Sequence, residues 1–359
     1  MNIHSRITES VRAGRPFCIV TVLSAEGSAP REAGTKALVD AEGRILGTVG
    51  GGLIEAEAQR AAVEACRSGR AAVLGFTMSG EAATGCEPIC GGAMRLLVDP
   101  TARKDAAAYS AAAAAASERR RGLLVTVVRG GAPAETEVTW HPEDEVAAAG
   151  WAHRLVDREA ARTCLADGRA RLLAADAGTA DSAVEVLVEP VIPHPRLLIA
   201  GGGHIGQALA AQALLVGFDV TVIDDRPEFT DRALFPEGVR LHCGDIAATL
   251  AGDDAGDDTY VVIVTRGHQH DAEALRACIR KPAAYVGMIG SRRKVALVRE
   301  SFIRSGLATA EEFDAVHAPI GLDIGAETVP EIAASILAEL IAVRRGGSAG
   351  RRPPHMRDR

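Results

Sequence analysis

Aromatic residues are scarce in this sequence, and so is net positive charge. Phenylalanine, tryptophan and tyrosine together make up 3% of the 359 residues. That is too few to build the stacking platforms with which proteins bind single-stranded nucleic acid. The formal net charge at pH 7 is −7, so the surface as a whole does not attract phosphate backbones. Both shortages argue against a nucleic-acid partner.

Long apolar runs are also missing. No stretch reaches the length needed to cross a bilayer, and residues 1–14 lack the apolar core of a signal peptide. The seven cysteines are an odd number, and without an export signal we expect them to be reduced thiols. We therefore expect a cytoplasmic protein without membrane contact. Its basic C-terminus, residues 346–359, is rich in Gly, Pro and Arg and is expected to be disordered.

The chain length suggests two domains, or three. We place the boundary at Pro190, Pro193 and Pro195, because proline is not expected inside a central strand. Before it, strands such as residues 17–23 mix with expected helices over residues 53–69 and 106–116. After it, short apolar strands alternate with helices, which indicates a parallel sheet covered on both faces. We predict an α/β protein with an N-terminal α+β domain, residues 1–190, and a Rossmann-like doubly wound domain, residues 191–345.

The second domain opens with a glycine motif. Residues 201–206 read Gly-Gly-Gly-His-Ile-Gly and follow the apolar strand 197–200 directly, and a helix begins after them. In this dinucleotide-binding pattern Gly201 permits a tight turn, Gly203 lets a pyrophosphate approach the backbone, and Gly206 lets helix and strand pack closely. Asp224 ends the next strand and could accept a bond from a ribose hydroxyl, which favours NAD over NADP, although the nearby Arg226 weakens that inference.

Residues 265–271, Thr-Arg-Gly-His-Gln-His-Asp, follow another strand of the second domain. The crevice of such a fold lies at the carboxyl ends of its strands. His268 and Asp271 could supply acid–base groups there. They could equally cap the following helix, because a carboxylate near a helix N-terminus satisfies free N–H groups.

A basic turn follows the strand expected over residues 284–290. Ser291 stands at an N-cap position, and Arg292, Arg293 and Lys294 form the first turn of the next helix. Cations at a helix N-terminus are repelled by the positive end of the helix dipole, and a bound anion would offset this repulsion. A solvated basic turn is the alternative.

For two segments of the first domain, the residue types alone do not decide between a binding role and a structural role. The second glycine triplet, Gly50 to Gly52, again leads from a strand into a helix and could wrap a phosphate or a pterin edge, or simply make a tight turn. Arg31 is available as an anion partner. Cys86 and Cys90 share one loop and could contact a soft metal centre or be structural thiols; Cys90 is the candidate metal ligand.

Taken in order, these segments resemble the xanthine dehydrogenase accessory proteins, the XdhC/CoxI family. The likeness spans residues 27–345. In the first domain it rests on "GSAPREAGTKALV", "GTVGGGLIEAEAQRAA" and "CGGAMRLLV". In the second it rests on "LLIAGGGHIGQALA", "VTVIDDRPEF", "TRGHQHD", "VGMIGSRRK" and "APIGLDIGAETVPEIAASILAEL". The family pattern has a Cys-Gly-Gly, which is Cys90-Gly91-Gly92 here. This sequence has an additional cysteine, Cys86, ahead of it, which leaves the role of the cysteine loop open.

The resemblance implies a maturation factor for molybdenum hydroxylases. Such a protein binds the molybdenum cofactor, as molybdopterin or its dinucleotide form, while a cysteine desulfurase supplies sulfur, and passes it to the apo-subunit of the hydroxylase. It would be an accessory protein and not an enzyme. The alternative is an NAD(P)-dependent oxidoreductase with His268 as proton shuttle. The sequence leaves open whether the chain forms a homodimer.

The residues proposed to bind the cofactor are Arg31, Gly50, Gly51, Gly52, Gly201, Gly203, His204, Gly206, Asp224, Arg226, His268, Asp271, Ser291, Arg292 and Arg293.

Overall fold

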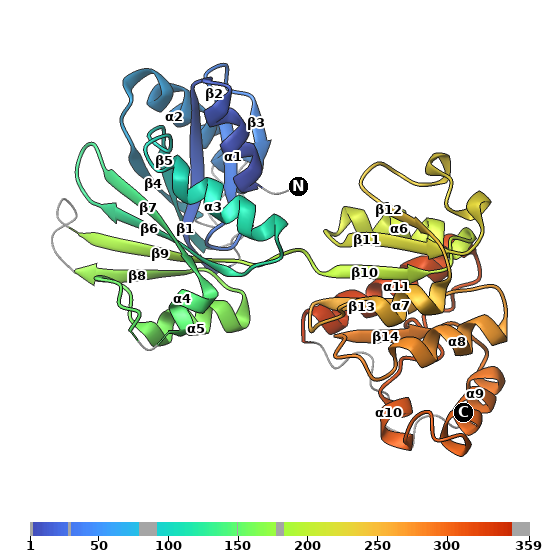
Figure 1. Ribbon diagram of the computed structural model, residues 1–359. Coiled ribbons are helices and arrows are strands. Elements are labelled where there is room, and N and C mark those ends of the chain that lie inside the picture. The colour runs from blue at the N-terminus through green and yellow to red at the C-terminus, as the bar shows by residue number, and fades with distance from the viewer. Residues whose placement is uncertain (1–2, 28–29, 79–91, 149, 177–182, 347–359) are drawn as a thin grey trace. The chain divides into compact units, whose positions relative to one another are not determined.

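A computed structural model describes residues 3–27, 30–78, 92–148, 150–176 and 183–346. The chain folds into two compact units, Met1–Pro193 and His194–Arg359, which contain different kinds of sheet (Figure 1). The tail that was expected to be disordered lies, from residue 347 onward, outside the described residues. No helix among the described residues is long and apolar enough to cross a membrane.

The first unit contains two antiparallel sheets, with strand orders β3-β2-β1-β5-β4 and β7-β6-β9-β8. The five-stranded sheet consists of β1 (Phe17–Gly27), β2 (Lys36–Asp40), β3 (Ile45–Gly47), β4 (Ala72–Met78) and β5 (Gly92–Asp99). The four-stranded sheet consists of β6 (Gly122–Arg129), β7 (Glu135–Pro142), β8 (Arg171–Asp176) and β9 (Val184–Val191). The helices are α1 (Ile3–Arg12), α2 (Gly52–Ser68), α3 (Ala106–Ser117), α4 (Glu143–Ala147) and α5 (Arg158–Asp167).

The two sheets of this unit pack face to face, and helices cover their outer faces. Leu23 and Leu97 of the larger sheet share a buried cluster with Val128 and Leu187 of the smaller one. α2 covers the other face of the larger sheet through small residues such as Ala58, which lets the helix lie close to the strands. α4 and α5 cover the outer face of the smaller sheet. This confirms the predicted α+β character.

Two ion pairs join the facing sheets. Lys36 Nζ lies 2.5 Å from Glu189 Oε1, and the two side chains are 3% and 8% exposed. Burial raises the pKa of Glu189, although Lys36 favours its ionised form. Nearer to solvent, Arg95 donates two hydrogen bonds to the carboxylate of Glu185, at 2.5 and 2.7 Å. The sheets are therefore held by charge as well as by apolar contact.

The expectation that Pro190 lies outside any central strand is wrong. Pro190 is the penultimate residue of β9, which has β6 on one side and β8 on the other. The pairing with β8 ends at Val188, so at Pro190 only β6 remains as a neighbour. A residue without an N–H group is tolerated there because one edge of the strand is already unpaired.

The second unit is built on one five-stranded parallel sheet, with the order β12-β11-β10-β13-β14. Its strands are β10 (Arg196–Ala200), β11 (Asp219–Asp224), β12 (Arg240–Cys243), β13 (Thr259–Ile263) and β14 (Tyr285–Met288). Its helices are α6 (His204–Leu215), α7 (Ile246–Gly252), α8 (His268–Cys278), α9 (Arg292–Arg304), α10 (Ala310–Asp314) and α11 (Val329–Arg344), with the 3-10 turns η1 (Pro227–Phe229) and η2 (Arg232–Leu234).

Helices cover both faces of the parallel sheet. Along β10, Leu197 and Ile199 point into a cluster with α6 and α11, whereas Leu198 and Ala200 point into a second cluster with α7, α8, α9 and α10. Both faces are buried, which explains why the strands read as continuous apolar runs. The arrangement confirms the predicted Rossmann-like doubly wound sheet. Because the strand order reverses at β10, the loops after β10 and β13 flank the place where such folds bind ligands.

Candidate functional site

The glycine loop of the second unit lies between β10 and α6. Gly201 has φ +120°, and a Cβ there would lie 2.5 Å from the carbonyl oxygen of Val264. A Cβ on Gly206 would lie 2.0 Å from the carbonyl oxygen of Gly201. Larger residues would clash with backbone at both positions. The loop and the first turn of α6 are therefore packed against β10 and β13 as closely as backbones allow.

Gly203 differs from its neighbours, because nothing lies within 4 Å of a Cβ built there and its φ of −67° suits any residue. It is the N-cap of α6, whose first residue, His204, is exposed. No acceptor among the described residues contacts the backbone N–H of Gly203, His204 or Ile205. The helix start thus presents free donors and a partial positive charge to open space, which suits an anion.

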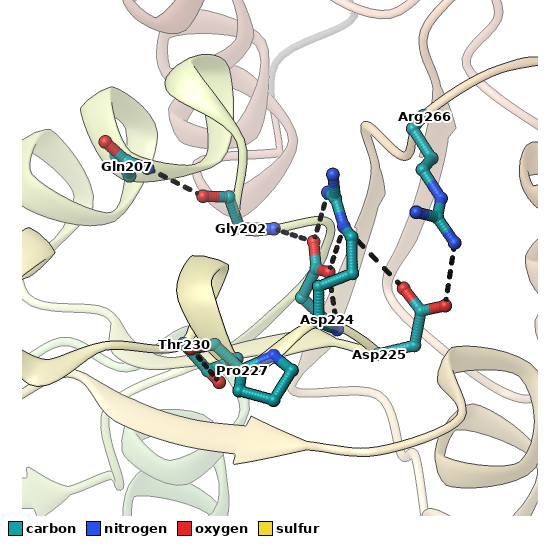
Figure 2. Close-up of polar contacts among 8 residues, drawn as sticks. Gly202, Gln207, Asp224, Asp225, Pro227, Thr230 and Arg266 are labelled. Atoms are coloured by element: carbon teal, nitrogen blue, oxygen red, sulfur yellow. Dashed lines mark hydrogen bonds and ion pairs between the residues drawn. The ribbon is translucent and has the colours of Figure 1, made fainter.

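The middle glycine of the triplet is held on both sides. The N–H of Gly202 donates to Asp224 Oδ2 at 2.8 Å, and its carbonyl oxygen accepts from Gln207 Nε2 at 2.8 Å (Figure 2). A Cβ on Gly202 would lie 2.1 Å from the carbonyl oxygen of Phe229. Sequence reasoning gave Gly202 and Gln207 no role. The only available signal was that Gly202 lies inside the triplet.

Asp224, expected to accept a bond from a ribose hydroxyl, is occupied by protein donors. Its side chain is 2% exposed, and besides Gly202 it accepts hydrogen bonds from the guanidinium of Arg226 at 2.9 and 3.0 Å. Burial opposes ionisation, but these bonds outweigh it and lower the pKa of Asp224. Arg226 also stacks over the ring of Phe229, 3.7 Å from its centroid. A ribose could reach Asp224 only if Arg226 moved away.

A second ion pair joins the loops that follow β11 and β13. Arg266 Nη2 lies 3.1 Å from Asp225 Oδ2, and both side chains are partly exposed (Figure 2). Since β11 and β13 flank β10, this pair lies at the carboxyl-end edge where the glycine loop also begins. Neither residue was among those expected at the site, because an Asp–Arg pair so far apart in sequence gives no local pattern.

The loop after β13 places Asp271 in a buried network. Asp271 is 0% exposed and accepts from the N–H and the hydroxyl of Thr265, at 3.1 and 2.6 Å, and from the ammonium of Lys294. Its carboxylate thus links the end of β13 to α9. His268 is the first residue of α8, and its side chain lies outside what the structure describes.

The basic turn divides into two kinds of residue. Ser291 accepts a bond from the N–H of Lys294 at 3.3 Å, which confirms the predicted N-cap of α9. Lys294 is paired with Asp271 and is therefore part of the internal network. Arg292 and Arg293 are exposed, and neither side chain has a hydrogen-bonding or ionic partner among the described residues. Two cations, not three, remain available for an anion at this helix start.

The glycine triplet of the first unit has a different construction. Gly51 and Gly52 have φ of +124° and +56°, yet no atom of the described residues lies within 4 Å of a Cβ at either position. Glycine is therefore required there by backbone conformation and not by crowding. A Cβ built on Gly50 would lie 3.5 Å from Pro30 Cγ, so the triplet lies close to Pro30 and the exposed Arg31 that follows it.

Metal binding has little support among the described residues. They contain no group of three or more His, Cys, Asp and Glu side chains arranged to hold a metal ion. Cys86 and Cys90, the candidates raised from sequence, lie outside the described residues.

Models of known protein families match segments of both units. A family model described as XdhC Rossmann domain matches residues 197–340, and one described as XdhC and CoxI family matches residues 10–77. The structure resembles the crystal structure of a xanthine dehydrogenase from Bacillus halodurans, with a TM-score of 0.74, 22% identity and 98% of each chain covered. At that identity the likeness shows the fold alone.

Three curated relatives match the chain. It is 26% identical over 351 residues to the uncharacterized protein YqeB of Escherichia coli, covering 98% of this chain and 48% of YqeB. It is 30% identical over 165 residues to a Bacillus subtilis protein described as a probable xanthine dehydrogenase subunit, covering 46% of this chain and 48% of that protein. It is 26% identical over 338 residues to the molybdenum cofactor insertion chaperone PaoD of Escherichia coli, covering 94% of this chain and 86% of PaoD. The matched segments thus span about half the length of the first two relatives.

Proposed function

Because the chain belongs to the XdhC and CoxI family, we propose that it is a maturation factor that binds molybdenum cofactor and delivers it to a molybdenum hydroxylase of the xanthine dehydrogenase type. The name of PaoD, a molybdenum cofactor insertion chaperone, supports this reading. So does the name of the Bacillus subtilis relative, which points to an enzyme of the xanthine dehydrogenase type as the partner.

One structural observation carries the proposal: at the start of α6, the N–H groups of Gly203, His204 and Ile205 have no acceptor among the residues that the structure describes. Molybdenum cofactor is a pterin that carries a phosphate, and in its dinucleotide form a pyrophosphate. Backbone donors at a helix N-terminus are a suitable cradle for such anions. Arg292 and Arg293, which have no partner in the described part of the chain, add positive charge at the start of α9 on the same sheet edge.

The alternative, hydride transfer with NAD, fits the site less well. A dinucleotide-binding Rossmann site uses the acidic residue after its second strand to bind the ribose. Here Asp224 already bonds to Gly202 and Arg226. In addition, Asp271, one of the two residues proposed for acid–base chemistry, is buried and ion-paired with Lys294. The site is therefore better explained as one that binds molybdenum cofactor than as one that catalyses hydride transfer.

The test is to purify the protein from cells that make molybdenum cofactor. We expect oxidised pterin fluorescence and molybdenum to co-purify with the wild-type chain. Gly203→Val should abolish both, whereas Arg304→Gln, on the far end of α9, should retain both. If neither pterin nor molybdenum is bound, even after incubation of the apo-protein with released cofactor, the proposal fails.

Sulfuration and delivery are tested separately. We propose that a cysteine desulfurase acts on the cofactor while this chain holds it. Loaded protein is mixed with an apo-hydroxylase, with and without a desulfurase and free cysteine, and hydroxylase activity is measured. Activation should require loaded protein and increase with the desulfurase. Equal activation by free cofactor at the same concentration would argue against a delivery role.

A further inference from the structure

Cys18 and Cys66 bring two thiols together in the first unit. Cys18 lies in β1 and is 0% exposed, whereas Cys66 lies in the last turns of α2 and is partly exposed. α2 covers the face of the sheet on which Cys18 is buried, and Cys66 packs against that same cluster. Each thiol is the group that most perturbs the pKa of the other, as expected for neighbours in one packed cluster. They are separated by 48 positions in sequence, so only the packing of α2 on β1 makes them neighbours.

We propose that Cys18 and Cys66 are a modification site, at which a hydroperoxide converts the two neighbouring thiols into a reversible disulfide. Cys66 is the residue that meets the oxidant, because it is reachable from solvent and Cys18 is not. Cys18 is the resolving residue, because it is buried in the cluster against which Cys66 packs. No part of the cofactor proposal is needed for this reaction.

The electronic environment of the two thiols supports these roles. The neighbouring Cys18 thiol lowers the pKa of Cys66, and this effect exceeds the opposing effect of burial. The neighbouring Cys66 and the burial of Cys18 raise the pKa of Cys18. The thiolate is the nucleophile toward peroxides. The pair therefore has one ionisable, accessible sulfur and one protonated, enclosed sulfur.

The chemistry balances in two steps. The Cys66 thiolate attacks hydrogen peroxide: an S–O bond forms, the O–O bond breaks, and the hydroxide released takes up a proton to become water. The sulfur of Cys18 then attacks the sulfenic acid of Cys66: the S–S bond forms, the S–O bond breaks, and the hydroxide leaves with the Cys18 proton as a second water. The two thiols lose two electrons, and the peroxide gains them.

The experiment uses the full chain, fully reduced and then exposed to hydrogen peroxide. Free thiols are blocked with N-ethylmaleimide, and tryptic peptides are identified by mass spectrometry. Trypsin separates the two cysteines because Arg31, Lys36 and Arg60 lie between them. We expect a linked Cys18–Cys66 peptide that lacks two hydrogen atoms, loss of both maleimide labels, and recovery of both with dithiothreitol. The buried Cys164 and Cys278 serve as internal references and should give no linked peptide.

Two variants separate the roles. Cys66→Ser should leave Cys18 unoxidised, and Cys18→Ala should leave Cys66 as a sulfenic acid that dimedone traps. Circular dichroism establishes that each variant is folded; if Cys18→Ala is not, Cys66→Ser carries the test, because its side chain is partly exposed. The proposal is overturned if Cys66 links to a different cysteine. It is also overturned if Cys66 proceeds to sulfinic acid while Cys18 keeps its maleimide label.

Discussion

The carboxylate of Asp224, at the end of β11, accepts a 2.8 Å hydrogen bond from the backbone N–H of Gly202, in the loop after β10. In dinucleotide-binding sites the acidic residue at this place faces the ligand. Here it fixes the glycine loop from within, and Arg226 covers its remaining lone pairs. The shape of the loop and the ionisation of Asp224 are therefore coupled.

This coupling predicts a pH-dependent loss of stability in Asp224→Asn. The pKa of Asp224 is lowered in the folded protein, and in an unfolded chain an aspartate has a pKa of about 3.9. Its contribution is therefore complete above about pH 4 and is lost as the pH falls through the lower, folded value. At pH 7 the substitution should reduce the free energy of unfolding by about 1–3 kcal/mol.

Urea unfolding at pH 7 and at pH 3 checks the prediction, and the difference between wild type and variant should shrink at pH 3. The control is Asp225→Asn, because Asp225 is 40% exposed in its pair with Arg266. That exposed pair should contribute less than about 1 kcal/mol. An equally large effect of Asp224→Asn at both pH values would contradict the account.

Arg226→Ala should increase affinity for NADH. Removal of the guanidinium frees Asp224 to accept hydrogen bonds from the ribose of the adenosine, the usual arrangement in NAD-binding Rossmann sites. NADH fluorescence titration measures the effect, and we expect affinity to rise about tenfold, since one charge-assisted hydrogen bond contributes about 1.5 kcal/mol. Arg304→Ala, in an exposed pair with Glu300, is the control. Unchanged NADH affinity would mean that Asp224 is closed for a reason other than Arg226.

Gly202 and Gly203 should respond in opposite ways to enlargement. A Cβ on Gly202 meets the carbonyl oxygen of Phe229 at 2.1 Å, so Gly202→Ala should destabilise the fold by about 1–3 kcal/mol or more. A Cβ on Gly203 meets nothing, so Gly203→Val should change stability by less than about 1 kcal/mol while it obstructs a ligand at the helix start. Thermal unfolding and pterin content are measured for both. Full cofactor binding by folded Gly203→Val would make the loop a packing device.

The fold of the second unit could be predicted from the sequence because short, apolar strands alternate regularly with helices. The apolar run before Gly201 and the N-cap signal of Ser291 both gave correct elements. β12 gives no strand signal in the sequence, because it lies at the sheet edge and is largely exposed and so lacks an apolar pattern. Pro190 was misplaced because the rule for central strands does not foresee a neighbour that ends early.

The site could be predicted only in part, because its contacts are tertiary. Sequence pattern correctly placed Gly201 and Gly206 in a strand–loop–helix unit and Asp224 at the end of the next strand. It could not show that Asp224 is already bonded within the protein, nor that Lys294 is paired with Asp271 from another element. Those bonds depend on how separate loops pack at one sheet edge. The spacing of residues along the chain carries no information about how these loops pack.

Replacement of Lys36 should reveal how much its buried ion pair with Glu189 contributes to the stability of the first unit. Lys36→Met leaves the carboxylate of Glu189 buried, and loss of one partner of such a pair costs about 3–5 kcal/mol. Burial already raises the pKa of Glu189, so without Lys36 the carboxyl should be protonated more readily. A group whose folded pKa is raised above its unfolded value of about 4.3 destabilises the ionised protein as pH rises. The defect should therefore be smaller at pH 5 than at pH 8.

Denaturant unfolding of the single variant and of Lys36→Met combined with Glu189→Leu measures this. The double variant should recover much of the lost stability, because no charge remains buried. If the double variant is no more stable than the single one, packing around Lys36, and not its charge, holds the two sheets together.

The first turn of α9 contains both proposed ligand-binding cations, Arg292 and Arg293, and a cation with a structural role, Lys294. Arg292 and Arg293 are exposed and have no partner among the described residues, whereas Lys294 is paired with the buried Asp271. Cations in a first turn oppose the helix dipole by about 0.3–1 kcal/mol each. Arg292→Gln with Arg293→Gln should therefore keep or raise the melting temperature of the free protein, whereas Lys294→Gln should lower it.

Cofactor binding should follow the opposite order. The double arginine variant should bind molybdenum cofactor more weakly, and the loss should shrink at high salt because screening weakens the wild-type attraction. The measurements are melting temperature and retained pterin at low and high ionic strength. Lys294→Gln should lower retained pterin only as far as it lowers the folded fraction, because its charge is used by Asp271. A double arginine variant that melts earlier yet retains all its pterin would place these arginines in the scaffold and remove them from the site.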